Sequence, residues 1–142
     1  MSEAITGDAL LESFEDCTFP PRQFHHLEHI RVAWLYLRRF TLPVALDRFD
    51  TSLKKYADAA GVTGLYHATI TWAYMLLIHE RIQRAPEVHE WEAFHRANPD
   101  LFTWKPSVLH RYYRPETLAS ELAKRVFLMP DCFRDQGLEM RG

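Results

Sequence analysis

Apolar residues recur at three- and four-residue spacing along most of the chain, which is the pattern of helices that bury one face. Such spacing predicts helices over residues 7–16, 23–40, 43–60, 65–84, 87–97 and 116–127. The helix over residues 23–40 carries the clearest stripe, formed by Ile30, Ala33, Trp34, Leu37 and Phe40. Residues 65–84 are apolar on most sides, so this helix is expected to be the central one.

Residues that stop helices separate these segments. Pro20 and Pro21 favour extended backbone, Gly61 is a good helix stop, and Pro86 ends the most apolar segment. Because the connections are short, neighbouring long helices are expected to run antiparallel. The pattern therefore predicts an all-α fold: a single domain over residues 1–142, built as a bundle of four to six antiparallel helices. Three of these would be long, with a short helix before them, two shorter ones after them and a brief tail.

Composition supports a packed helical domain and narrows the choice of partners. Of the 142 residues, 47% are hydrophobic and only 5 are glycine, which argues against a sandwich or barrel of many short strands. The formal net charge is -2, so no basic excess points to nucleic acid or to an anionic membrane surface.

The expected location is the cytoplasm. Cys17 and Cys132 are far apart and belong to no C-x-x-C pair, which fits a reducing compartment but leaves one disulfide open. The first residues are acidic and polar, unlike a signal peptide, and no apolar run is long enough for a membrane span.

Three of the eight histidines lie within five residues, in His25-His26-Leu27-Glu28-His29. Residues three and four apart share a helix face, so His26 or His25 could chelate a divalent metal together with His29. His29 leads into the apolar stripe and is expected to point inward, where helical bundles build their metal sites.

A third ligand would have to come from another element, and His67 at the start of the most apolar helix is the best candidate. The sequence thus predicts a divalent transition metal, zinc or iron before nickel or copper, held by His26, His29 and His67 with His25 as substitute. A small molecule would bind beside the metal in the bundle interior, where the protein would sense it or, as a metal-dependent enzyme, act on it. The remaining candidate site residues are Glu28, as an outer-shell group or proton acceptor, and Tyr66, Thr71 and Tyr74, as the lining.

Other interpretations compete with the metal site. The histidines could be structural, each donating one hydrogen bond to a carbonyl, or they could make the bundle responsive to pH. The surplus of aromatics suggests a non-catalytic interaction module, such as a homodimer. His25 to His29 formally match H-x-x-E-H, but this short chain lacks the rest of that peptidase architecture. A late aromatic group could line a pocket or, the favoured reading, plug one end of the bundle: Trp104, His110, Tyr112 and Tyr113.

Overall fold

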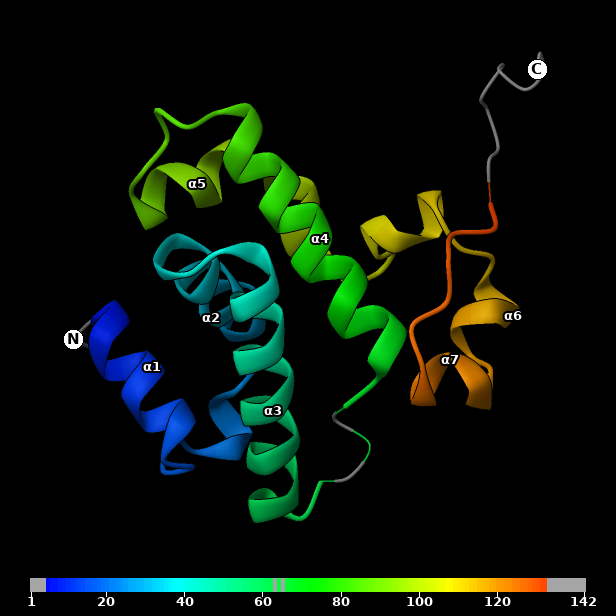
Figure 1. Cartoon of the computed structure of the whole chain (residues 1–142), viewed down its shortest axis with the longest axis horizontal. Coiled ribbons are helices and arrows are strands. Elements are labelled where there is room, and N and C mark those ends of the chain that lie inside the picture. The colour runs from blue at the N-terminus through cyan, green and yellow to red at the C-terminus, as the bar shows by residue number, and fades with distance from the viewer. Residues whose placement is uncertain (1–4, 63, 65, 133–142) are drawn as a thin grey trace.

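The computed structural model describes residues 5–62, 64 and 66–132, and it confirms the all-α fold (Figure 1). No β-strand occurs in these ranges. The α-helices are α1 (Gly7–Glu15), α2 (His26–Arg39), α3 (Leu42–Ala60), α4 (Ala68–Arg84), α5 (Trp91–Ala97), α6 (Pro115–Leu118) and α7 (Glu121–Arg125). Single 3-10 turns lie between these helices, at Pro21–Gln23, Pro99–Phe102 and Val108–Arg111.

Two predicted helices differ clearly from the structure: one is divided, and one begins later than expected. The helix predicted over residues 116–127 is α6 and α7, because the side chain of Ser120 accepts a hydrogen bond from the Ala123 amide and starts a new helix there. The helix predicted from residue 87 begins only at Trp91. The described residues therefore contain seven α-helices, where four to six were predicted.

The core lies where α2, α3 and α4 meet, and α1 packs against α2 and α3. Helix α2 buries Ile30, Ala33 and Leu37 of its predicted stripe. Helix α4 was expected to be the central helix, but it leaves Leu76 and Leu77 half-buried. It contacts α2, α3, α7 and the 3-10 turn at Val108–Arg111.

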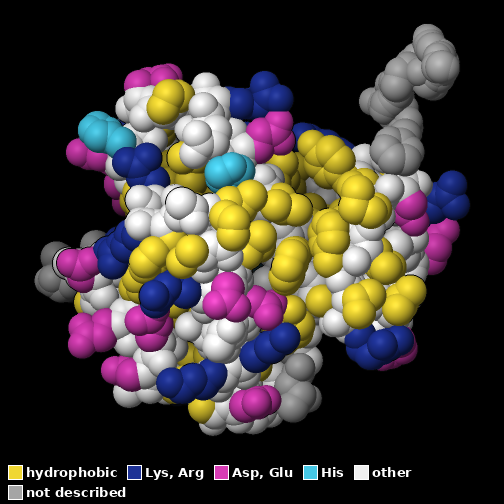
Figure 2. Space-filling model, viewed as in Figure 1, with side chains coloured by type: hydrophobic (Ala, Val, Ile, Leu, Met, Phe, Trp, Pro, Cys, Tyr) yellow, Lys and Arg dark blue, Asp and Glu magenta, His cyan; other side chains and the backbone are white. Residues whose placement is uncertain are grey.

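The last described segment is held against the start of α4. The fully buried Thr69 hydroxyl donates to the carbonyl of Val126 (2.8 Å) and accepts from the amide of Leu128 (3.1 Å). Beside it, the rings of Trp72 and Phe127 lie 6.0 Å apart. Figure 2 shows hydrophobic side chains gathered on the face where Figure 1 places α4 and the C-terminal helices.

Two further observations bear on the sequence predictions. No helix over the described residues combines the length and apolar character that a membrane crossing needs. Cys17 and Cys132 are both half-buried and form no disulfide.

Candidate ligand-binding cavity

A cavity of about 470 Å³ opens between α2, α3 and α4, within the size range of small-molecule sites. Helices α2 and α4 supply most of its wall, and α3 contributes Phe49. Trp104 comes from the irregular segment between α5 and α6. The residues that line it are Phe24, His25, His26, His29, Ile30, Ala33, Phe49, Gly64, His67, Ile70, Thr71, Tyr74 and Trp104.

His29 is half-buried in the wall of the cavity. Its ring lies 4.4 Å from that of Phe24, centroid to centroid, and it makes no hydrogen bond to any described residue. Burial, and secondarily the nearby His26, lower the pKa of His29 to about 3. The imidazole is therefore neutral at physiological pH and offers the cavity one donor and one acceptor nitrogen.

His26 lies one turn earlier on the same helix, and one of its two ring nitrogens already forms a hydrogen bond. Its Nε2 donates to the carbonyl of Leu101 at 2.8 Å, which leaves Nδ1 as the acceptor of the neutral ring. The rings of Tyr74 and Trp104 pack against it, with centroids 5.2 and 5.0 Å away. Burial lowers the pKa of His26, opposed by its hydrogen bond to Leu101.

His67 lines the cavity but already uses both ring nitrogens. It is the N-cap of α4: Nδ1 accepts from the Ile70 amide at 3.1 Å, and Nε2 donates to the Leu118 carbonyl at 2.7 Å. A neutral imidazole with this pattern has no lone pair left for a metal. The structure thus brings His26, His29 and His67 to one cavity, but the ring of His67 is used to cap α4 and to bind the Leu118 carbonyl.

His25 and Glu28 serve the start of α2. The Glu28 carboxylate accepts from the His25 amide at 2.8 Å, which satisfies a donor that the first turn leaves open. The imidazole of His25 lies at the rim of the cavity with a side chain that is 73% exposed. Glu28 does not line the cavity, and its role as an outer-shell group or proton acceptor stays a prediction.

Of the three predicted lining residues, two line the cavity and one does not. Thr71 and Tyr74 are buried and line the cavity, and the Tyr74 hydroxyl lies 2.7 Å from the Ser107 hydroxyl. Tyr66 lies outside it and donates instead to Asp50, which also accepts from the Trp72 indole at 3.2 Å. Tyr66 directly precedes the N-cap of α4, where the chain has not yet adopted the helical direction that aims Thr71 and Tyr74 inward.

No three His, Cys, Asp or Glu side chains gather as a metal-binding group in the part of the chain that the structure describes. Of the cavity histidines, His25, His26 and His29 each keep a ring nitrogen that forms no hydrogen bond to the described residues, whereas His67 does not. The predicted metal site stays a prediction.

Sequence reasoning missed most of the apolar wall. Phe24 and Phe49 are buried core residues whose spacing gives no sign of a cavity. Within the late aromatic group, Trp104 lines the cavity while 45% exposed, and Tyr113 is 1% exposed with its hydroxyl donating to Leu128. The four residues therefore do not act together: Trp104 lines the cavity, Tyr113 lies in the core, and His110 and Tyr112 are exposed.

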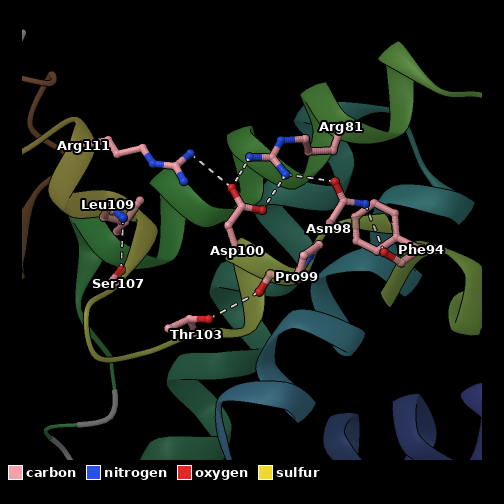
Figure 3. Close-up of polar contacts among 9 residues, drawn as sticks. All are labelled: Arg81, Phe94, Asn98, Pro99, Asp100, Thr103, Ser107, Leu109 and Arg111. Atoms are coloured by element: carbon pink, nitrogen blue, oxygen red, sulfur yellow. Dashed lines mark hydrogen bonds and ion pairs between the residues drawn. The ribbon is translucent and has the colours of Figure 1, made fainter. Parts of the chain in front are cut away.

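An ion-pair cluster holds the segment that carries Trp104 (Figure 3). Arg81 of α4 donates to both oxygens of Asp100, at 3.0 and 2.8 Å, and to Asn98 at 2.9 Å. Arg111 adds a bond of 3.2 Å to the same carboxylate. The hydrogen bonds from Arg81 are the main reason why the pKa of Asp100 is lowered. This cluster fixes the backbone just before Leu101 and Trp104, both of which contact His26.

Comparison with known protein families, curated proteins and solved structures finds no match for this chain.

Proposed function

We propose that this protein binds a small, largely apolar molecule in the cavity between α2, α3 and α4, as a carrier or a sensor. The observation that carries the proposal is the neutral imidazole of His29 among apolar walls, without a hydrogen-bond partner among the described residues. Ligand sites combine apolar lining with a few such polar groups that orient the guest. Because His29 lines the cavity and its ring forms no hydrogen bond with the described residues, its nitrogens can donate to or accept from a guest.

The proposal is tested by titrating the protein with the neutral fluorescent probe N-phenylnaphthylamine. Saturable binding of one equivalent is expected. Ala33, which lines the cavity and is 2% exposed, is replaced in Ala33→Phe to fill the space; the matched control Ala59→Phe adds the same ring to an exposed position of α3. Ala33→Phe should weaken binding at least about tenfold, while Ala59→Phe leaves it unchanged.

Overpacking can destabilise a core, so thermal unfolding of each variant is recorded, and a second filling variant, Ile70→Phe, is measured in parallel. Absence of saturable binding to the wild type, or equal binding by both folded filling variants and the control, contradicts the proposal.

A metal ion is the second candidate occupant, favoured by one observation: His26 and His29 line the same cavity from adjacent turns. In this form of the hypothesis His26 Nδ1 and one nitrogen of His29 would hold zinc or iron, and the bound molecule would complete the coordination. Elemental analysis of protein purified without a histidine tag tests it. Metal that disappears in His29→Ala and persists in His110→Ala supports this form; no metal above background counts against it.

The interaction-module alternative receives no support from the aromatic residues that suggested it. Among the described Phe, Tyr and Trp side chains, Trp104 and Tyr112 are the exposed ones, and the others are buried or half-buried. Aromatics inside the core stabilise the fold and leave little aromatic surface for a partner. Light scattering over a range of concentrations remains the measurement that decides whether the chain forms a dimer.

A further inference from the structure

The wall of the cavity is aromatic on several sides. Phe24 and Phe49 come from the core, and Tyr74 and Trp104 come from α4 and the segment after α5. The ring of Phe24 lies against His29, and those of Tyr74 and Trp104 lie 6.5 Å apart, centroid to centroid. Aromatic rings pack favourably with a planar aromatic guest in offset or edge-to-face geometry. The wall therefore favours a flat ring system over a bulky or fully flexible chain.

The described lining carries no Lys, Arg, Asp or Glu side chain. A charged group brought into such a space would lose its hydration without gaining a counter-charge, which is strongly unfavourable. The guest is therefore expected to enter as a neutral molecule.

The polar groups of the cavity suit a hydroxyl on that guest. The His29 ring lines the cavity without a hydrogen bond to a described residue and has a nitrogen that can accept one, and the Thr71 hydroxyl, which also lines the cavity, can donate or accept. A phenolic hydroxyl is an acidic donor and at the same time an acceptor, so it can satisfy both groups. An ether in the same place can only accept, so it cannot donate to the imidazole nitrogen and forms one hydrogen bond fewer.

Resting on the proposed function, we infer that the natural ligand belongs to the neutral phenols: an aromatic ring or fused ring pair whose hydroxyl donates to the imidazole of His29. Thr71 is the second contact of that hydroxyl. This assignment names a substrate class for the cavity and gives His29 the role of its specificity-determining residue.

Three probes of nearly the same shape test the inference: β-naphthol, its methyl ether and β-naphthoate. Binding to the wild type is measured by calorimetry, with competition against N-phenylnaphthylamine. β-Naphthol is expected to bind about tenfold more tightly than the ether, the size expected for the net contribution of one hydrogen bond. β-Naphthoate, which carries a full negative charge, is expected to bind most weakly.

Variants assign the preference to His29. His29→Phe keeps an aromatic ring and should bind β-naphthol and the ether equally, whereas His29→Gln restores an acceptor and part of the preference. His89→Phe, at an exposed position far along the chain, is the matched control and should retain the full preference. Thermal unfolding confirms that each variant is folded.

The outcomes separate the two proposals. Equal binding of β-naphthol and the ether by the wild type, or tightest binding of β-naphthoate, overturns the phenol assignment and leaves the cavity as a general apolar site. A preference that survives in folded His29→Phe overturns the role of His29. If no probe binds, N-phenylnaphthylamine included, the proposed function itself fails.

Discussion

The Nε2 atom of His67 donates a hydrogen bond to the carbonyl oxygen of Leu118, 51 positions later in the chain, at 2.7 Å. Through its other ring nitrogen the same side chain caps α4 by accepting from the Ile70 amide. One imidazole thus joins the start of a core helix to the end of α6. This double use explains how a histidine can line the cavity and still serve the fold.

His67→Ala is expected to destabilise the protein by about 2 kcal/mol, because it removes an N-cap and leaves the half-buried Leu118 carbonyl without its donor. His67→Asn should lose less, because Asn is a good N-cap but is too short to reach Leu118. Urea unfolding measures both, and His110→Ala, at an exposed position, is the control. Equal stability of His67→Ala and the control would show that the two bonds contribute nothing.

Acid should destabilise the protein through His29. Its pKa is about 3 in the folded state and about 6.5 when unfolded. Between these values the unfolded chain binds a proton that the folded chain does not, so stability falls as the pH decreases from 6.5 towards 3. The contribution of His29 is at most about 3 kcal/mol at pH 4, and it vanishes above pH 6.5.

The measurement is the free energy of urea unfolding at several pH values. The slope below pH 6.5 should be much smaller in His29→Phe than in the wild type, while His110→Phe keeps the wild-type slope. His26, whose pKa burial also lowers, adds a smaller dependence of the same sign. An unchanged slope in His29→Phe would mean that its imidazole is solvated in the folded state.

Arg81→Met is expected to reduce stability by about 2 kcal/mol, because Arg81 and Asp100 form a partly buried, bidentate pair and the variant leaves the carboxylate with only the outer Arg111. The matched control is Arg84→Met, which breaks an exposed pair with Glu80 on the same helix and should change stability by less than about 0.5 kcal/mol. Similar losses in the two variants, measured by urea unfolding, would contradict this ranking.

The same pair makes a second, separable acid response. The pKa of Asp100 is lowered from 3.8, chiefly by the hydrogen bonds from Arg81. A depressed carboxyl pKa stabilises the folded state above pH 3.8, and that stabilisation is lost as the pH falls through the lower, folded-state value. In Asp100→Asn this loss should be absent, so comparing the wild type and the variant at pH 5 and pH 3 isolates it from the His29 response.

Thr69→Val should destabilise the protein by about 2 kcal/mol with little change in core volume. The Thr69 hydroxyl is the partner of both the Val126 carbonyl and the Leu128 amide, and valine leaves these groups unsatisfied. Thr51→Val, at an exposed position of α3, is the control. Hydrogen exchange provides a second measurement, because the amide of Leu128 should lose protection in Thr69→Val alone.

The sequence alone was sufficient to predict those features of the molecule that depend on the spacing of nearby residues. The stripe on α2 and the inward position of His29 follow from helical periodicity, and so do the buried Thr71 and Tyr74 on α4. These residues are set by neighbours three or four positions away, and such patterns are visible in a single sequence.

What the sequence could not supply are contacts between distant segments. The capping of α4 by His67 needed the position of the Leu118 carbonyl, and a backbone carbonyl has no signature in sequence. Trp104 belongs to an irregular segment, where periodicity gives no direction, and its place beside His26 depends on the Arg81–Asp100 pair. The division of the last helix at Ser120 was readable in principle, since serine is a strong N-cap, but the apolar spacing across it outweighed that signal.

The segment that closes the cavity is anchored on both sides of Trp104. Asp100 is clamped by Arg81 before it, and the Ser107 hydroxyl lies against that of Tyr74 after it. Between these anchors, the indole of Trp104 forms the outer part of this wall and is 45% exposed. The rate at which a guest escapes should therefore follow the rotation of one ring, so that replacing Trp104 by alanine shortens residence time more than it reduces equilibrium affinity.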